Sequence, residues 1–549
     1  MPNPYYLTTP IYYVNDRAHI GHCYTTTIAD VLARYQRLLR GESTPPTGPS
    51  EVFLLTGTDE HADKVVTSAA ANGHTPQAWC DRNAQAFREA FAFMGVSFTD
   101  FIRTTEPRHK DRVPEYVAAL IASGDIYKGE YTGWYDEGQE EYVTESAARD
   151  AGFKSVISGR PLVQRTEACY FFRLSKYQDA LRDLIENNAR FIRPNARRQE
   201  VLGRLRQGLN DVPVSRPVTD DPATQWGIRI PGDPSHRVYV WIDALFNYLT
   251  VVDTPERRRF WPASLHLIGK DILWFHAVIW PALLLALRAS GPAYEWVALP
   301  RSIFGHGWWV SNGQKMSKSL GNFIDLERLQ AYAARYSLDA LRWHLLSQGP
   351  LGGTDADFSH DKFVEVYNAD LANGVGNCVS RVGNMIEKYF AGAMPPFDPA
   401  PLAGVIDVPG VCRAAAADAL AALAEDDPAG SAAQGARIVR AVDEFIGATA
   451  PFKLAKDPAN LAQVGSILGV CAEALRVASV LFAPAMPDKM GALWRTWTCA
   501  PPPGATLAAL LEFGGPHALR VGQRIAKGDN LFQRANPADA PPGAEPATP

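Results

Sequence analysis

The chain has 549 residues, of which 46% are hydrophobic and 21% are charged. This length is enough for about three domains, and the composition excludes an intrinsically disordered chain. The formal net charge of −5 argues against a protein that binds nucleic acid through its overall charge, so any such contact needs local basic patches.

Cysteine usage and hydropathy indicate the cellular compartment of the protein. The seven cysteines are scattered and form no C-x-x-C pair, which argues against a disulfide framework and against a zinc knuckle. No uncharged apolar run is long enough to span a membrane, and the N-terminus carries no secretory signal. We therefore expect a cytoplasmic protein without membrane contact and without structural zinc.

Residues 1–115 predict the first half of an α/β domain. The segment YYLTTPIYY predicts a strand, and a polar turn and an amphipathic helix that ends at Gly41 come after it. The segment EVFLLTGTDEHADKVV repeats this plan, with an apolar strand, a polar turn and a helix. Two more helices, TPQAWCDRNAQAFREAFAFMG and EPRHKDRVPEYVAALIASG, complete the segment. Strands that alternate with helices predict a parallel sheet.

The rest of the chain changes character several times. Residues 116–230 hold short aromatic strands, an Arg-rich stretch and turns rich in Pro and Asp, which predicts an inserted subdomain. The α/β pattern resumes over 231–300, and 301–362 is expected to connect it to the C-terminal part of the chain. Residues 363–533 are Ala-rich and predict a helical domain, with DLANGVGNCVSRVGNMIEKYF and AVDEFIGATAPFKLAK as amphipathic helices. The Pro/Ala-rich residues 534–549 predict a disordered tail.

Polar clusters come after four of the predicted strands. They are the two histidines after the first strand, TGTDEH after the second, GKD after residues 265–268, and SNGQKMSKS after SIFGHGWWV. Ligands of an open parallel sheet bind outside the C-terminal ends of its strands, so these clusters are expected to share one crevice. Neither G-x-x-x-x-G-K-[ST] nor G-x-G-x-x-G is present, which argues against a P-loop enzyme and a typical dinucleotide enzyme.

Two of these clusters suggest contacts with phosphate. His19 and His22 flank Gly21 where a helix begins, and a helix N-terminus attracts anions; the alternative is a surface cap with incidental histidines. The segment GQKMSKSLGN carries Lys315 and Lys318 between glycines, so it can close over a polyphosphate. The alternative for this segment is a solvated surface loop.

The pair HIGH and KMSKS resembles the signature of class I aminoacyl-tRNA synthetases. The segments TTPIYYVND, GTDEH, GWY, YFFRLSKY, YVWIDALFNY, HLIGKDILWFH, GQKMSKS and LANGVGNCVSR resemble the methionyl-tRNA synthetase family, in that family's order, over roughly residues 4–533. The resemblance implies an α/β Rossmann-like parallel-sheet catalytic domain with an inserted connective subdomain, followed by an α-helical bundle that binds the anticodon. It also implies ATP-dependent activation of L-methionine and its transfer to tRNA(Met), initiator included, for translation initiation and elongation.

The resemblance also assigns roles to residues. ATP would contact His19, Gly21, His22, Gly269, Asp271 and Lys318, with catalysis by His19, His22, Lys315 and Lys318, and Mg²⁺ would accompany ATP. Asp59 would hold the α-ammonium group of methionine. The methionine pocket would be lined by Ile11, Tyr13, Trp241, Ala244, Tyr248, Ile272 and His276. Trp241 and Tyr248 also suit a plain hydrophobic core. The CAU anticodon would meet Asn377, Arg381 and Phe452, although Phe452 also suits packing between two helices.

The chain departs from the family pattern at several points. GWYDEGQEEYVTES has no cysteine where zinc-binding pairs would fall, which favours a zinc-free insert. Leu245 stands where a proline is common, Pro10 where a small residue is common, and Phe452 where a tryptophan is usual. The chain ends without the appended dimerising tRNA-binding module of longer family members, so a monomer is expected.

Other functions remain open from the sequence. Another class I synthetase is one, although the leucine, isoleucine and valine enzymes need a longer insert and the cysteine enzyme needs zinc ligands. A nucleotidyltransferase with an H-x-G-H motif would leave KMSKS unexplained. A non-catalytic tRNA-binding paralogue would leave the intact histidines and lysines unexplained.

Overall fold

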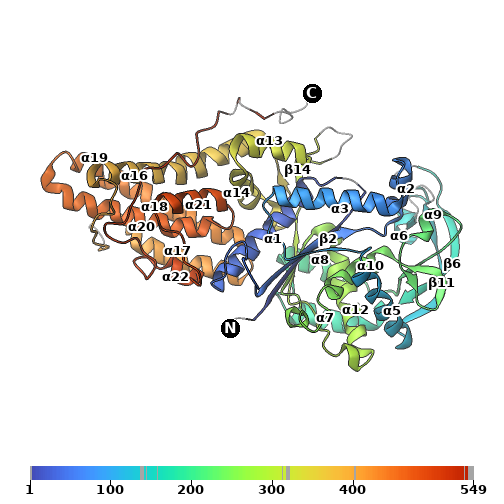
Figure 1. The fold of residues 1–549 in the computed structure, drawn as a ribbon. Coiled ribbons are helices and arrows are strands. Elements are labelled where there is room, and N and C mark those ends of the chain that lie inside the picture. Colours follow the sequence, from blue (N-terminus) through green and yellow to red (C-terminus); the bar gives the residue numbers. More distant parts are fainter. Residues whose placement is uncertain are drawn as a thin grey trace.

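The computed structural model describes residues 3–15, 17–136, 141–143, 145–156, 159–311, 313–316, 322–400, 404–536, 538 and 540–541. Its centre is a six-stranded sheet in the order β3-β2-β1-β12-β13-β7, and every neighbouring pair is parallel. The strands are β1 (Tyr5–Tyr13), β2 (Val52–Asp59), β3 (Asp100–Arg103), β7 (Ile192–Arg193), β12 (Leu265–Gly269) and β13 (Ile303–His306). Together with the helical C-terminal region, this confirms the predicted α/β fold class (Figure 1).

The helix α1 (Ile20–Leu39) is buried along almost its whole length. It lies between the sheet and the helical part of the chain (Figure 1). The polar face of an amphipathic surface helix is solvated, but the polar face of α1 is buried. Asp30 on this face binds Arg34 at 2.7 Å and the buried Arg342 at 2.7 Å. The expectation of an ordinary amphipathic helix therefore needs this correction: buried ion pairs replace water on its polar side.

The first half of the α/β part has the predicted order. After β2 come α2 (Asp63–Ala71) and α3 (Pro76–Phe93), and after β3 come α4 (Pro107–Lys110) and α5 (Arg112–Ala122). Thr75 caps α3 through its side chain, and Pro76 occupies the first helical turn, where its missing N–H is not needed.

The insert consists of two small antiparallel sheets and short helices. One sheet has the order β5-β4-β6-β8 and the other β10-β11-β9. Their strands are β4 (Ile126–Asp136), β5 (Glu141–Val143), β6 (Val163–Phe172), β8 (Val212–Pro213), β9 (Ser215–Pro217), β10 (Arg229–Ile230) and β11 (Asp233–Val238). The helices are α6 (Glu145–Asp150), α7 (Gln178–Asn187), α8 (Asn195–Leu205) and α9 (Pro222–Gln225).

The main sheet also draws strand β7 from the segment 116–230, which we expected beside it. Strand β13 comes from SIFGHGWWV, which we predicted as a strand. A two-residue strand such as β7 has no periodicity to read, which is why the sequence did not separate it from the insert. Past the insert, α10 (Val240–Leu245) and α11 (Asn247–Thr250) precede β12, and a π-helix, η4 (Phe275–Ile279), leads into α12 (Trp280–Ala289).

A three-stranded sheet contains Gln314 and Lys315, near the start of the cationic segment GQKMSKSLGN. It has the order β15-β14-β16, with β14 (Trp309–Ser311), β15 (Gln314–Lys315) and β16 (Ala356–Asp357). Two helices, α13 (Leu326–Tyr336) and α14 (Leu338–Gln348), come after the segment. Lys318 lies outside the described residues, and of Lys315 only the backbone is described.

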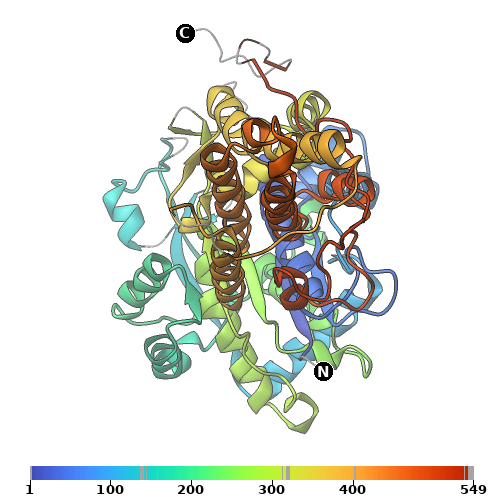
Figure 2. The same ribbon diagram turned by 90° about the vertical axis from the view of Figure 1, so that its left-hand side faces the viewer.

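The C-terminal part is a helical bundle, which faces the viewer in Figure 2. Its helices are α15 (His360–Val366), the π-helix η8 (Tyr367–Gly376), α16 (Asn377–Phe390), α17 (Val408–Ala424), α18 (Pro428–Thr449), α19 (Pro451–Leu454), α20 (Leu461–Phe482), α21 (Pro487–Thr496) and α22 (Leu507–Leu511). Contrary to the prediction, AVDEFIGATAPFKLAK is not one helix. It breaks at Ala450, whose φ of 44° is left-handed, because Pro451 cannot continue α18.

The most apolar helix of the described part is Pro458–Phe482, which is long and apolar enough to cross a membrane. However, 94% of its most apolar window is buried inside the protein. It also carries a buried ion pair, Arg476 to Glu473 at 2.7 Å. These features are those of the central helix of the bundle.

Candidate active site

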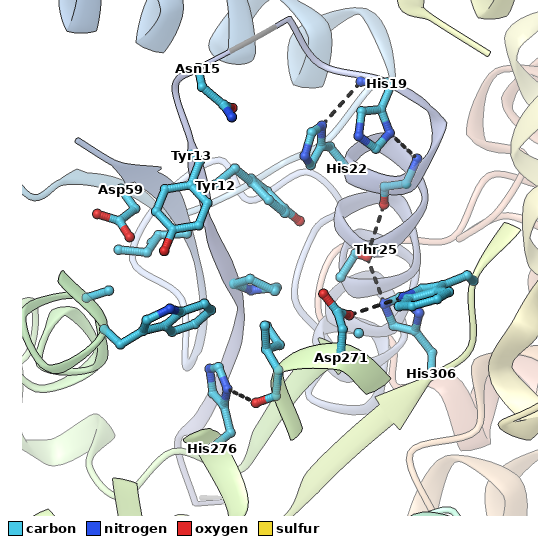
Figure 3. A pocket seen from close by; sticks show the side chains of 18 of the residues that line it. Tyr12, Tyr13, Asn15, His19, His22, Thr25, Asp59, Asp271, His276 and His306 are labelled. Carbon is cyan, nitrogen blue, oxygen red and sulfur yellow. Dashed lines mark hydrogen bonds between the residues drawn. The ribbon is translucent and has the colours of Figure 1, made fainter. Parts of the chain in front are cut away.

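A cavity of about 540 Å³ opens at the C-terminal ends of β1, β2 and β12 (Figure 3). Its walls hold every predicted ATP and methionine contact except the lysines. The lining residues are Pro10, Ile11, Tyr12, Tyr13, Asn15, His19, Gly21, His22, Thr25, Asp59, Trp241, Ala244, Leu245, Tyr248, Gly269, Asp271, Ile272, His276, His306, Trp308 and Phe323. The predicted convergence on one crevice is thus present for the three clusters that lie fully in the described part of the chain.

The two histidines cap α1 and line the cavity at the same time. His19 Nδ1 accepts a hydrogen bond from the Gly21 amide at 3.0 Å, and His22 Nδ1 accepts one from the His19 amide at 3.3 Å. Because both Nδ1 atoms are acceptors, each neutral ring carries its hydrogen on Nε2. Desolvation by the surrounding protein, and then the nearby His19, lower the pKa of His22 well below its usual value. The cap therefore presents neutral N–H donors, beside the positive end of the helix dipole.

Aromatic rings and a backbone bridge hold these histidines in place. The His22 ring meets Tyr12 edge-on at 4.8 Å and Phe87 at 5.1 Å between centroids. His19 forms an antiparallel bridge with Asp325, and the Ile20 amide donates to the Ile324 carbonyl at 3.0 Å. The start of α1 is thereby attached to the chain that leaves the cationic segment.

Asp59 stands across the cavity from the histidines (Figure 3). Its side chain is 3% exposed, and its Oδ1 has no hydrogen-bond partner among the described residues. Burial, and then the charges of Asp243 and Glu60, raise the pKa of Asp59 well above its usual value. A buried carboxylate with an open oxygen is stabilised by a cation, so this position suits a positively charged ligand group.

The wall beside Asp59 is apolar and aromatic. Trp241 stacks on Phe275 with centroids 4.2 Å apart, and Tyr13 meets Trp241 edge-on at 6.0 Å. Such a wall suits an unbranched apolar side chain, and a thioether sulphur packs well against aromatic rings.

Tyr248 and His276 close the deep end of this wall. Tyr248 donates from its hydroxyl to His276 Nε2 at 2.9 Å, and His276 Nδ1 donates to the Ile272 carbonyl at 3.0 Å. Burial lowers the pKa of His276 to about 4, so the ring is neutral and accepts from Tyr248 at neutral pH. Tyr248 is 1% exposed and also lines the cavity. It is therefore both a core residue and a residue of the cavity wall, as both interpretations from the sequence allow.

The opposite end of the cavity is formed by Gly269 and Asp271. A Cβ on Gly269 would lie 2.6 Å from Asp271 Oδ1, so only glycine fits there without a shift of that side chain. Asp271 Oδ1 accepts from Trp308 Nε1 at 3.1 Å. Trp308 is also the neighbour of Lys270, whose ammonium lies 4.5 Å from the centre of its ring and binds Asp355 at 2.7 Å.

Several lining residues were not predicted. Trp308 and His306 belong to GHGWW, which we placed inside the predicted strand SIFGHGWWV, whereas β13 ends at His306. Thr25, whose hydroxyl lies 2.8 Å from His306 Nε2, sits inside α1 and gave no signal. Asn15 and Phe323 likewise carried no pattern of their own. Pro10 and Leu245, two of the departures from the family pattern, both line the cavity.

The residues predicted to read the anticodon lie in the helical bundle, away from the cavity. Asn377 is exposed at the start of α16, and Arg381, one turn on, binds Asp443 on α18 at 2.5 Å. Phe452 in α19 is 45% exposed. This exposure is more than a residue packed between two helices would show.

Metal-binding side chains do not gather in the described part of the chain. No group of three or more His, Cys, Asp or Glu there could hold a metal ion. All seven cysteines are free. The zinc-free insert stays a prediction.

Comparisons with known proteins agree with this geometry. The family model of the class I tRNA synthetases (M) matches residues 5–151 and 150–383. The methionine–tRNA ligase of Streptomyces coelicolor is 39% identical to this chain, and the match covers 96% of each of the two chains. That of Caldanaerobacter subterraneus is 38% identical over 97% of this chain and 79% of its own. The solved structure of Mycobacterium tuberculosis methionyl-tRNA synthetase in complex with methionyl-adenylate superimposes with a TM-score of 0.83 at 34% identity, covering 97% of this chain and 100% of that chain.

Proposed function

The chain belongs to the class I tRNA synthetases and is a methionine–tRNA ligase, and on this premise we propose that the cavity is where ATP and L-methionine react. In this reaction a methionine carboxylate oxygen bonds to the α-phosphorus of ATP, the α–β phosphoanhydride bond breaks and pyrophosphate leaves. Methionine then passes from the adenylate to tRNA. The observation that carries the proposal is the buried Asp59, with an open oxygen, between an aromatic wall and the histidine-capped helix.

Methionine lies along the wall that contains Asp59. The α-ammonium group meets the open Oδ1 of Asp59, which replaces the solvation that burial removes from both charges. The thioether side chain lies among Ile11, Tyr13, Trp241, Ala244, Tyr248, Ile272 and His276. The carboxylate then points toward the start of α1, where the phosphates bind.

ATP lies between the start of α1 and the end of β12. The phosphates accept hydrogen bonds from Nε2 of His19 and His22, and the absence of a side chain at Gly21 lets them approach the helix N-terminus. The adenosine part rests on Gly269 and Asp271. Because the attacking carboxylate is already anionic, the step needs no general base, and neutral donors that align the phosphates suit it.

The cationic segment completes the site. Lys315 and Lys318 neutralise the charge that builds on the departing pyrophosphate, with Lys318 the main contact. Mg²⁺ supplies further neutralisation of phosphate charge when it is bound with ATP. No group of three or more metal-binding side chains lies in the described part of the chain, so the ion would be held chiefly by phosphates and water, which is usual for Mg²⁺.

The tRNA partner spans the two halves of the chain. Its 3′ end reaches the cavity, and its CAU anticodon meets Asn377, Arg381 and Phe452 on the bundle. The substrates include both initiator and elongator tRNA(Met), and the enzyme works as a monomer in the cytoplasm. Exposed Phe452 next to Lys453 supports the anticodon assignment, since a ring beside a cation suits base stacking with a phosphate contact.

One assay tests the proposal at its centre. ATP–pyrophosphate exchange is measured with each of the twenty amino acids, on the natural chain and on Asp59→Asn. We expect methionine alone to support exchange. The variant should raise the KM for methionine at least about a hundred-fold, because a buried ammonium group loses its counter-charge.

The matched control is Asp63→Asn. Asp63 lies four residues on, is paired with Arg237 at 2.6 Å and is not among the lining residues, so its loss should leave KM unchanged. Exchange driven equally well by another amino acid would reject the substrate. A wild-type KM for methionine in Asp59→Asn would reject the role of Asp59.

A further inference from the structure

A buried cluster of three titratable side chains lies behind the cavity wall. Asp243 accepts from His61 Nδ1 at 2.6 Å and from His109 Nε2 at 2.7 Å. The three side chains are 1%, 4% and 0% exposed, respectively. None of them is among the lining residues of the cavity, so the activation of methionine does not use them directly.

The cluster joins the two walls of the methionine part of the cavity. His61 comes after β2, and its backbone amide donates a hydrogen bond to the carboxylate of Asp59. Asp243 lies in α10 between Trp241 and Ala244, which both line the cavity. The bond between His61 and Asp243 therefore connects the residue that orients Asp59 to the helix that forms the aromatic wall.

His109 braces the same carboxylate from a third element. It lies in α4, and its Nδ1 is 3.1 Å from the hydroxyl of Thr250 in α11. This contact orients the ring so that Nε2 points at Asp243. Each oxygen of Asp243 is thus occupied by a different histidine.

We propose that His61, Asp243 and His109 are positioning residues that set the distance between Asp59 and the aromatic wall, and thereby the affinity for the ammonium and side chain of methionine. This inference rests on the proposed function, since it takes Asp59 as the ammonium acceptor. A displacement of about 1 Å in a binding group costs up to about a hundred-fold. Loss of one of the two bonds to Asp243 is expected to raise the KM for methionine about ten-fold.

Simple packing does not account for this cluster. A buried carboxylate is costly to desolvate, and apolar side chains of similar volume would hold α4 and α10 together without that cost. Apolar contacts lack direction, however, and only a hydrogen bond of fixed geometry holds the His61 backbone at one distance from α10.

The two histidines donate from different nitrogens, which gives the test its own control. Asparagine places an amide nitrogen near the position of Nδ1, and glutamine near that of Nε2. His61→Asn should therefore keep the bond to Asp243 and His61→Gln should lose it. At position 109 the order is reversed, because His109 donates from Nε2: His109→Gln should keep the bond and His109→Asn should lose it.

The measurement is ATP–pyrophosphate exchange on the full chain, with KM for methionine, KM for ATP, kcat and Tm for all four variants. We expect about a ten-fold higher KM for methionine in His61→Gln and His109→Asn, near wild-type values in His61→Asn and His109→Gln, and an unchanged KM for ATP. Tyr116→Phe is the structural control, because it removes a buried bond of 2.7 Å to Asp253 away from the cavity. It should lower Tm and leave both KM values unchanged.

Two outcomes overturn the inference. One is a wild-type KM for methionine in both His61→Gln and His109→Asn. The other is a KM for methionine that changes in step with Tm across all variants, Tyr116→Phe included, because a purely structural role predicts that correlation. If Asp59→Asn itself leaves the KM for methionine unchanged, it is the proposed role of Asp59 that fails. If Asp59→Asn raises the KM for methionine but the histidine variants leave it unchanged, the inference fails and the proposed function stands.

Discussion

A methyl group at Gly21, between the two histidines, is expected to lower activity while leaving stability intact. A Cβ on Gly21 would lie 2.9 Å from Cε1 and 3.2 Å from Nδ1 of His19. Carbon atoms pack best at about 3.5–4.0 Å, so the ring must retreat by roughly 0.5–1 Å. The bond of 3.0 Å from the Gly21 amide to His19 Nδ1 would be lost with that movement.

The two effects on stability nearly cancel. Alanine in place of glycine stabilises a helix by about 1 kcal/mol. Loss of the side-chain bond at the N-cap costs about 1 kcal/mol. The effects on catalysis do not cancel, because a reactive group displaced by about 1 Å costs up to about a hundred-fold in rate. Gly21→Ala should therefore lower kcat of ATP–pyrophosphate exchange about 10–100-fold, with the KM for methionine and Tm close to those of the natural chain.

The control is Gly203→Ala in α8. A Cβ on this helical glycine has no atom within 4 Å, so this variant should keep full activity and gain a little stability. Exchange assays at saturating methionine and ATP, with thermal unfolding on the same samples, give both readouts. A Gly21→Ala enzyme with wild-type kcat would refute the argument that the position of His19 matters to the reaction.

Three further residues of the site and the bundle give measurable expectations. Lys318→Ala should lower kcat about 10²–10³-fold and barely change the KM for methionine, as a contact made mainly in the transition state requires; wild-type kcat would reject this role. Phe452→Ala should lower tRNA charging about 10–100-fold and leave methionine activation intact, while Phe452→Trp retains charging; joint loss of activation and Tm would favour a packing role instead. The folded pKa of His276, about 4, lies below its unfolded value, so the neutral ring stabilises the fold above pH 6.5 and this stabilisation fades as pH falls toward 4. As the pH is lowered toward 4, the free energy of unfolding of the natural chain should therefore fall by up to roughly 3 kcal/mol more than that of His276→Gln. Denaturant unfolding at several pH values measures this difference.

The sequence alone determined the features that depend on neighbours along the chain. Apolar runs such as YYLTTPIYY predicted strands, and polar residues at their ends predicted the crevice, because parallel strands end at one edge of a sheet. The order of HIGH, GTDEH, GKD and KMSKS carried the family and hence the reaction. Local periodicity and short motifs are enough for such conclusions, since strand, turn and helix signals are all read within a few residues.

Only the tertiary structure decided what joins residues far apart in the chain. The strand β7 is too short to have a pattern, and α1 is buried on its polar side because Arg342, from another helix, pairs with Asp30. The bonds from His61 and His109 to Asp243 span 182 and 134 residues. No spacing in the sequence encodes such contacts, because they form only when the sheet, the insert and the helices pack together and a buried carboxylate must find its donors.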